Sequence, residues 1–217
     1  MRNIQDIVNG YGQIDYASLL DFVTANPLGT FTQQAPHPFL VGKDLYDGSL
    51  KKKIGGTLAS TSTMKFSVSE LRAGDNDDEE ELSDTKTALE IEAPGQSPAL
   101  DREREKILKS VYVFRKKGMP GVFSEGVVNI GRNGMNDIVI LDRVISGKHA
   151  QITVSDGLYI IEDKNSTNGT YVNSKRIPPG HNIQLKLNDE VAFGRIVFVF
   201  THPLLVYRAM RKEILGY

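Results

Sequence analysis

Residues 163–173 read DKNSTNGTYVN, a run made almost entirely of small polar residues. It lies between two apolar stretches, LYII at 158–161 and VAFGRIVFVF at 191–200. Asn, Ser, Asp and Gly hydrogen-bond to nearby backbone and tolerate positive φ angles, and Asn168-Gly169 is a strong signal for a hairpin turn. The stretch therefore predicts a loop between two β-strands.

Short runs of β-branched and aromatic residues continue on both sides of this loop. Gly, Pro, Asn and Asp separate them at close intervals, which is typical of a β-sandwich or barrel. Helical patterns of ten or more residues do not alternate with them, which argues against a parallel α/β sheet. The runs are SVYVFRKK, VVNI, DIVIL, HAQITV, LYIIED, TYV, NIQL, EVAF and IVFVF. We therefore expect a mainly β domain over residues 107–217.

The chain ends on a different pattern, PLLVYRAMRKEIL at 203–215. Pro203 suits the first turn of a helix. The apolar residues that fall near one helical face are Leu204, Tyr207, Met210 and Ile214. A short C-terminal helix is predicted to close the domain.

Residues 1–58 are predicted to form a small mixed extension. Asp15 is a candidate N-cap for a helix through YASLLDFV, and Asn26-Pro27 ends that helix. HPFLVG at 37–42 indicates a short strand. Because so few large apolar groups would make a marginal core alone, we expect the extension to pack against the sandwich.

Residues 59–106 are predicted to be a largely disordered linker, rich in Ser and Thr and then acidic, with MKFSV as a strand-like island. Residues 75–92 hold nine Asp and Glu against one Lys, a net charge of -8. Residues 107–217 hold fifteen Lys and Arg against nine Asp and Glu, a net charge of +6. The acidic segment is either a solvated spacer or an internal ligand for the basic domain.

Two further loops share the unusual polar content of the first, GRNGMND at 131–137 and LDRVISGKHA at 141–150. Three loops of one sandwich can meet at a shared end, as binding loops do on rigid scaffolds. Their pooled side chains offer a guanidinium, an ammonium, two hydroxyls and an amide, which suit a phosphate presented on a peptide. These residues are Arg132, Ser146, Lys148, Thr167 and Asn168.

In order along the chain, GR at 131–132, S-x-x-H-A at 146–150, D-x-x-S-T-N-G-T at 163–170 and L-N-D-E-V-A-F-G at 187–194 resemble a forkhead-associated (FHA) domain. The resemblance runs from about residue 110 to 200 and suggests a small bacterial protein with a single FHA domain. It implies a β-sandwich of about eleven strands, which binds phosphothreonine peptides through the loops at one end.

The resemblance also implies a role for each contact residue. Arg132 would meet the phosphate or the adjacent peptide backbone. Ser146 and Thr167 would each donate a hydroxyl to a phosphate oxygen. Asn168 would hydrogen-bond the peptide backbone beside the phosphothreonine.

Three further residues are expected to shape the site. Gly131 would allow a tight approach of its loop, and Gly169 would supply a turn conformation that a Cβ opposes. His149 is implied to be structural and to brace the loops. The residue after the loop serine, commonly Arg or Lys in this family, is Gly147 here, and the following Lys148 either compensates for it or is a solvated surface charge.

The acidic segment contains two candidate phosphorylation sites, Thr85 and Thr87. About 20 residues separate Thr87 from the sandwich, and a flexible chain of that length spans about 25 Å. A phosphorylated threonine there is able to reach the binding loops. The two hypotheses are intramolecular occupation of the site and a plain spacer.

Catalysis, metals and cofactors are not expected. Cysteine is absent, which excludes disulfides, thiolate metal sites and cysteine nucleophiles. The four histidines show no metal-ligand spacing. No G-x-x-x-x-G-K-[ST] loop, G-x-S-x-G elbow or set of kinase loops occurs either.

Nucleic acid and membranes are not expected partners. KKK at 51–53 and the basic domain favour nucleic acid, but without a recognition helix or base-stacking motif the charge is more simply a phosphate-reading face. No apolar run approaches the roughly 20 residues that span a bilayer, and MRNIQDIVNGYG lacks the apolar core of a signal peptide. We expect a cytoplasmic protein.

The sequence thus predicts a phosphothreonine-peptide-binding adaptor in Ser/Thr-kinase signalling, self-regulated if its acidic linker is phosphorylated. Its partners would be a phosphothreonine-containing protein and a Ser/Thr protein kinase. The alternative is an FHA-fold scaffold that does not bind phosphate, which Gly147 keeps open.

Overall fold

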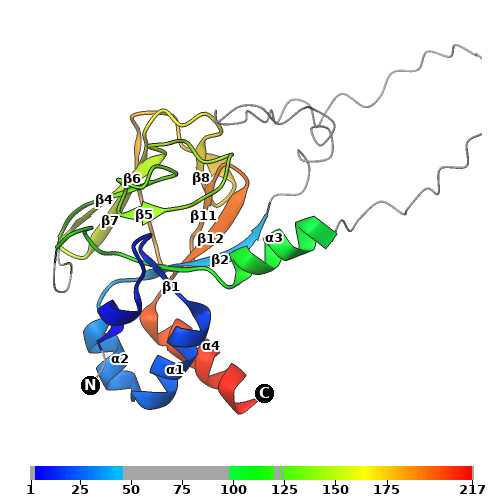
Figure 1. Cartoon of the computed structure of the whole chain (residues 1–217). Coiled ribbons are helices and arrows are strands. Elements are labelled where there is room, and N and C mark those ends of the chain that lie inside the picture. Colours follow the sequence, from blue (N-terminus) through cyan, green and yellow to red (C-terminus); the bar gives the residue numbers. More distant parts are fainter. Residues whose placement is uncertain (1–2, 46–97, 120–122, 124, 217) are drawn as a thin grey trace, which may run out of the picture.

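Two packed β-sheets form the body of the protein (Figure 1). The computed structural model describes residues 3–45, 98–119, 123 and 125–216. The seven-stranded sheet has the order β1-β3-β2-β12-β11-β8-β9, and the five-stranded sheet has the order β10-β7-β6-β4-β5. Neighbouring strands are antiparallel except for β4 and β5, which are parallel. The mainly β sandwich that the sequence predicts is confirmed.

The strands are β1 (Gln13–Ile14), β2 (Phe39–Leu45), β3 (Val111–Val113), β4 (Gly126–Gly131), β5 (Ile138–Val139), β6 (Ala150–Ser155), β7 (Leu158–Asp163), β8 (Thr170–Val172), β9 (Lys175–Arg176), β10 (Asn182–Gln184), β11 (Glu190–Phe193) and β12 (Ile196–Thr201). The helices are η1 (Ile4–Ile7, a 3-10 helix), α1 (Tyr16–Ala25), α2 (Leu28–Gln34), α3 (Pro98–Leu108) and α4 (Pro203–Leu215).

The main core lies between the two sheets and follows the alternation of the strands. In β4, Val128 and Ile130 are buried, whereas the intervening Asn129 is partly exposed on the outer face. Phe193, Phe198 and neighbouring apolar side chains fill the same cluster from the other sheet. Each large apolar side chain buried in this way contributes roughly 1.5–3 kcal/mol to folding.

The N-terminal segment takes part in the seven-stranded sheet itself. The run HPFLVG, which the sequence assigns to an extension, provides β2, and β2 pairs with β12 on one side and β3 on the other. Tyr11 and Gly12 also meet the sandwich, since the carbonyl oxygen of Tyr11 accepts a hydrogen bond from the Val139 amide at 3.0 Å. The segment is therefore integral to the fold.

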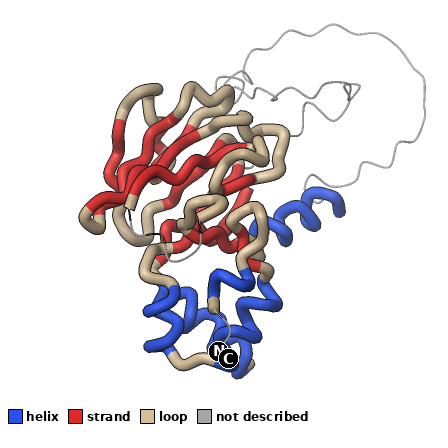
Figure 2. The backbone as a smooth tube through the Cα atoms, turned by 60° about the vertical axis from the view of Figure 1, so that its left-hand side comes forward, coloured by secondary structure: helices blue, strands red, loops and turns tan. Residues whose placement is uncertain are grey.

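Helices α1, α2 and α4 gather at one end of the sandwich (Figures 1 and 2). Asp15 caps α1, with its carboxylate accepting from the Ser18 amide at 3.0 Å, as the sequence predicts. Pro203 opens α4 in its first turn, also as predicted. Helix α4 buries Pro203, Val206 and Met210, and Tyr207 packs against the same cluster. Of the other apolar residues expected near that face, Leu204 is partly exposed and Ile214 is exposed.

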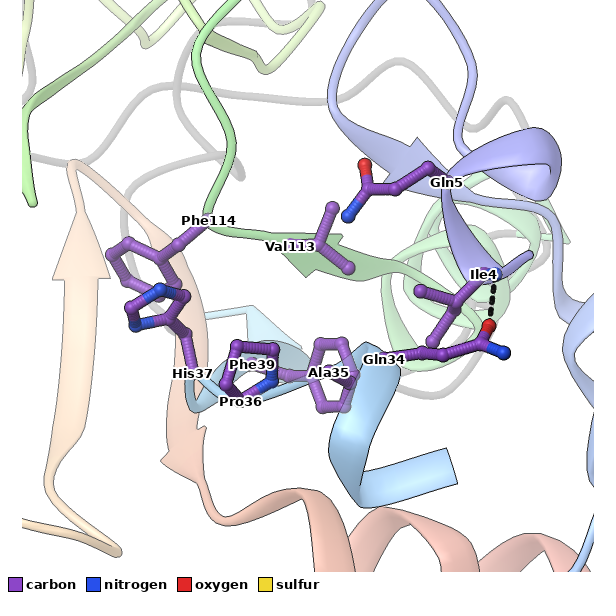
Figure 3. Close-up of a pocket in the computed structure, with 9 residues that line it drawn as sticks. All are labelled: Ile4, Gln5, Gln34, Ala35, Pro36, His37, Phe39, Val113 and Phe114. Carbon is purple, nitrogen blue, oxygen red and sulfur yellow. Dashed lines mark hydrogen bonds between the residues drawn. The ribbon is translucent and has the colours of Figure 1, made fainter. Parts of the chain in front are cut away.

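A small pocket marks the joint between these helices and the sandwich (Figure 3). Its volume is about 10 Å³, roughly that of one water molecule. His37 lies at its rim, where Nδ1 is 2.9 Å from the hydroxyl of Tyr159 and Nε2 contacts the carbonyl oxygen of Phe123. Both contacts join the N-terminal segment to the five-stranded sheet side of the molecule.

Helix α3 lies beside β2, and its residues 98–106 fall within the range predicted to be linker. Arg104 of α3 pairs with Asp44 of β2 at 2.7 Å. Gly42 permits the close approach, because a Cβ there would be 1.7 Å from the Ile107 carbonyl oxygen. The MKFSV run, Thr85 and Thr87 lie outside the described residues. Within the described ranges, no helix is both long and apolar enough to cross a membrane.

Candidate functional site

The three polar loops meet at the end of the sandwich opposite α4. They connect β4 to β5, β5 to β6 and β7 to β8. The strand register brings them together, because Ile130 pairs with Ala150 and Ala150 pairs with Asp163. The amide of Gly194, in the turn between β11 and β12, donates to the Gly169 carbonyl at 2.9 Å and ties the third loop to the other sheet.

Arg132 joins the first loop to the second. Its backbone amide donates to the Ser146 carbonyl at 2.9 Å, and its guanidinium Nε donates to the Ile145 carbonyl at 3.2 Å. The side chain is half-buried. These contacts hold the guanidinium beside Ser146, where it offers a fork of donors to an anion.

Ser146 and Thr167 form a pair of hydroxyls across the second and third loops. The Ser146 hydroxyl accepts a hydrogen bond from the Thr167 amide at 2.9 Å. The two hydroxyl oxygens are 3.4 Å apart, a long contact that is weak enough to give way to a better acceptor. Two convergent hydroxyl donors therefore lie next to Arg132.

Asn168 of the third loop also bonds to the second loop. Its side-chain amide donates to the Val144 carbonyl at 2.8 Å, and the residue is only 3% exposed. The Tyr171 hydroxyl donates to the Asn168 carbonyl at 3.3 Å. This side chain positions the loops, whatever it contacts in a ligand.

His149 lies buried beneath the hydroxyl pair. Its Nδ1 accepts from the Ser146 amide at 3.1 Å, so Nε2 carries the proton and donates to the Gly169 carbonyl, also at 3.1 Å. Burial lowers the pKa of His149, although the Gly169 hydrogen bond and the nearby Asp163 carboxylate act in the opposite direction. The neutral ring thus joins the second loop to the third.

Asp163 organises the third loop. Its carboxylate accepts from the hydroxyls of Ser166 and Thr170, both at 2.6 Å, and from the Ser166 amide at 3.0 Å. These contacts explain why a D-x-x-S-x-x-x-T pattern gives a rigid turn, since the polar side chains replace backbone partners that the turn leaves unpaired.

Two glycines permit close packing at the site. A Cβ on Gly131 would lie 2.4 Å from the Gly147 carbonyl oxygen and 2.8 Å from the Asn136 amide nitrogen. Gly169 has a φ of +81°, and a Cβ there would lie 2.6 Å from Nε of Arg176. Neither position accommodates a side chain without a shift.

The residues that follow Ser146 are open to solvent. A Cβ on Gly147 would meet nothing within 4 Å. Lys148 is exposed, and within the described residues its side chain makes no hydrogen bond or ion pair. Hydrogen bonds link Arg132 to Ser146 and Ser146 to Thr167, and Asn168 bonds to Val144 of the second loop. No such bond joins Lys148 to the described residues around it.

A buried ion-pair network supports the second loop, and the sequence analysis did not include it. Arg195 is buried, and its Nη2 donates to Asp142 at 2.9 Å and to Glu103 of α3 at 2.8 Å. The other oxygen of Asp142 accepts from the Val144 amide at 2.8 Å. The sequence signal that could have indicated a buried ion pair is Arg195 itself, which stands inside the apolar run VAFGRIVFVF.

In the part of the chain that the structure describes, no three His, Asp or Glu side chains are grouped so that they could hold a metal ion. The site instead collects a guanidinium, two hydroxyls and an adjacent exposed ammonium. The chemistry of this set suits a multivalent oxyanion, which accepts charge-assisted hydrogen bonds.

Part of the chain is similar to known proteins. Residues 128–194 match a family model described as FHA domain. An ABC transporter ATP-binding/permease protein of Mycobacterium tuberculosis is 35% identical over 96 residues, which cover 44% of this chain and 11% of the transporter. An oxoglutarate dehydrogenase inhibitor of Corynebacterium efficiens is 27% identical over 115 residues, which cover 51% of this chain and 79% of the inhibitor. The chain thus spans about a tenth of the length of the transporter.

One solved structure comes from a structural and functional analysis of phosphothreonine-dependent FHA domain interactions. It is 26% identical to this chain, with a TM-score of 0.36, and the match covers 42% of this chain and 83% of that one.

Proposed function

We propose that the chain, whose residues 128–194 match the FHA domain model, binds phosphothreonine-containing peptides and acts as an adaptor in Ser/Thr-kinase signalling. In this proposal its partners are a phosphorylated protein and the kinase that modifies it, and it works in the cytoplasm. In this proposal the protein acts by binding the phosphorylated partner, a role that requires neither a cofactor nor catalysis.

The observation that supports this function best is the convergence of Arg132, Ser146 and Thr167 from three separate loops. A phosphate has several acceptor oxygens, and the guanidinium and two hydroxyls offer donors from different directions. The hydroxyls meet through a 3.4 Å contact, so little is lost when they turn to a phosphate.

Lys148 and Asn168 complete the proposed contact set. Lys148 contributes an exposed positive charge close to Ser146. Asn168, already bonded to the Val144 carbonyl, is proposed to contact the peptide main chain beside the phosphothreonine.

Substitution of Arg132 tests the function directly. Arg132→Ala should weaken binding of a phosphothreonine peptide by about tenfold or more, because a hydrogen bond to a charged group contributes roughly 1.5–3 kcal/mol. Isothermal titration with phosphorylated and unphosphorylated forms of one peptide measures the effect. Arg208→Ala, at the exposed surface of α4, is the matched control.

Full affinity in a folded Arg132→Ala protein would exclude this site. Circular dichroism and thermal unfolding check the fold of both variants, since Arg132 also bonds to the Ile145 carbonyl.

A non-phosphate-binding scaffold is the second candidate, and Gly147 is the observation that favours it. The position carries no side chain where this family commonly has a cation, and this reduces the positive charge at the site. Titration of the unmodified protein separates the two functions, because a scaffold shows no phosphate-dependent heat.

Self-regulation through Thr85 and Thr87 is a further part of the proposal. A tethered phosphothreonine has an effective concentration on the order of millimolar, which is enough to outcompete a micromolar partner. Protein phosphorylated at both threonines should bind an external phosphopeptide at least about tenfold more weakly than a Thr85→Val/Thr87→Val protein. Equal affinities would leave the acidic segment as a spacer.

A further inference from the structure

A groove lined mainly by polar residues begins beside the proposed phosphate site and continues onto the outer face of the five-stranded sheet. Its volume is about 650 Å³. The residues that line it are Asn129, Asn133, Met135, Asn136, Lys148, Ala150, Gln151 and Lys164. They come from β4, from β6 and from loops at the binding end of the sandwich.

The groove is continuous with the phosphate loops. The Gly147 carbonyl accepts from the Asn133 amide at 3.1 Å and from the Asn136 side chain at 2.7 Å, so the near wall is fixed to the loop that carries Ser146. Farther along, Asn129 and Gln151 are cross-strand partners on the outer face. A peptide whose phosphate lies at Ser146 has this groove directly beside it.

The charge of the groove is positive at its near end. Lys148 makes no ion pair within the described residues. Lys164 is partly neutralised by Glu162, with an Nζ–Oε1 distance of 2.9 Å, and Glu162 also accepts from Gln151 at 2.8 Å. Lys148 is therefore the cation in the groove that stands without an acidic partner there.

The rest of the lining suits an extended chain. The side-chain nitrogen of Gln151 donates to Glu162, and the side-chain oxygen of Asn133 accepts from the Met135 amide. The Asn133 nitrogen and the Gln151 oxygen can therefore pair with an acceptor and a donor of a peptide backbone. Met135 is 85% exposed at the rim, and its flexible apolar side chain can cover the methylene groups of a bound side chain.

Resting on the proposed phosphothreonine function, we propose that this groove selects acidic residues on one flank of the phosphothreonine, with Lys148 as the residue that determines this preference. Acidic side chains in the groove complement Lys148, and the preference is confined to one flank because the groove leaves the phosphate site in one direction. Lys148 then pairs with acidic side chains of the peptide that flank the phosphothreonine.

Three phosphothreonine peptides test the inference: one with alanine on both flanks, one with three glutamates before the phosphothreonine and one with three glutamates after it. Fluorescence anisotropy on the full chain should show about three- to tenfold tighter binding for one acidic peptide only, as expected for one or two exposed ion pairs. In the Lys148→Glu variant, the affinity for that acidic peptide divided by the affinity for the alanine peptide should fall to one or below. Lys186→Glu, the same charge change in a loop that bonds to the far end of β12, should keep the ratio.

The outcomes separate this inference from the function on which it rests. If no peptide binds in a phosphate-dependent manner, the proposed function fails. If all three bind through Arg132 with equal affinity, only the groove assignment is wrong. If Lys148→Glu weakens all three by one common factor, Lys148 contacts the phosphate itself and the flank preference is refuted.

Discussion

Gly147 shows how one residue sets the charge of the proposed site. It directly follows Ser146, yet it adds no side chain to the surface. Because a Cβ at this position meets nothing within 4 Å and the φ angle is not in the left-handed region, the backbone accepts a larger residue.

Gly147→Arg should therefore fold normally and strengthen phosphothreonine-peptide binding by about tenfold, as a guanidinium that reaches the phosphate adds a charge-assisted hydrogen bond. Titration calorimetry measures the gain. Gly134→Arg adds the same charge in the neighbouring loop, also into open space, and should give a much smaller gain. An equal gain in both variants would show that only general electrostatic attraction was increased.

His149 makes the stability of the protein dependent on pH. Its pKa is lowered by burial in the folded state, whereas the unfolded chain has a value near 6.5. Below about pH 6.5 the unfolded state therefore binds more protons than the folded state. The contribution of neutral His149 to the free energy of unfolding is fully present above that pH, and it is lost as the pH falls toward the folded-state pKa.

Urea unfolding at pH 7.5, 6.5 and 5.5 should show this loss, with a slope of up to about 1.4 kcal/mol per pH unit below 6.5 from His149. A His149→Gln variant should be less stable at pH 7.5 but should lose less stability on acidification. Parallel pH profiles for the two proteins would assign the acid sensitivity to other groups.

At the residue scale, sequence motifs found most of the binding loops but not their internal contacts. Arg132, Ser146, Thr167 and His149 stand in motifs whose spacing is recognisable. The structure brings them together. Asp163 bonds to Ser166 and Thr170 of its own motif, whereas Asn168 bonds to the Val144 carbonyl, 24 residues away, so the bracing role of Asn168 has no local signal.

At the level of the elements, a buried arginine connects α3 to the second loop of the proposed site. Glu103 of α3 and Asp142 of the second loop share one nitrogen of Arg195. The Nε and Nη1 atoms of Arg195 are buried and have no hydrogen-bond partner within the described residues. Because a buried charge without a partner is costly, the stability of this region depends strongly on the carboxylates of Glu103 and Asp142.

Glu103→Ala should therefore loosen the second loop and weaken phosphopeptide binding by about two- to fivefold, a loss of about 1 kcal/mol or less. Glu105→Ala, on the same helix, removes a fully exposed carboxylate and is the control. Anisotropy titrations compare the two. A Glu103→Ala protein with unchanged affinity would show that α3 is not coupled to the loop.

The elements also show where a local pattern stops being informative. Asp15 and Pro203 mark helix starts by local chemistry, and both predictions are confirmed. The place of β2 between β3 and β12 depends on residues far away in the chain, and no periodicity reveals such pairing. The buried face of α4 likewise depends on what the helix packs against, and it includes Val206, which the sequence pattern did not group with Tyr207 and Met210.

On the scale of the whole molecule, two cores share the seven-stranded sheet. One lies between the sheets and the other lies under α1, α2 and α4. The N-terminal segment contributes β1 and β2 to this sheet, so a chain cut before α3 would lose part of its fold. Binding experiments on this protein therefore need the intact chain.

Helices α1, α2 and α4 and the polar loops occupy opposite ends of the sandwich, whereas α3 lies at its side along β2 (Figure 1). This arrangement leaves the binding end open to a peptide, while the other end is closed by packed helices. The central claim is that the open end binds phosphothreonine through residues of three loops.

Amide NMR of the intact, isotope-labelled protein tests that claim most directly, in a titration with one peptide in its phosphothreonine and unphosphorylated forms. The account predicts large shifts at Arg132, Ser146 and Thr167 with the phosphorylated peptide, and none with the other. Shifts that are equal for both forms, or that fall away from these loops, would contradict it.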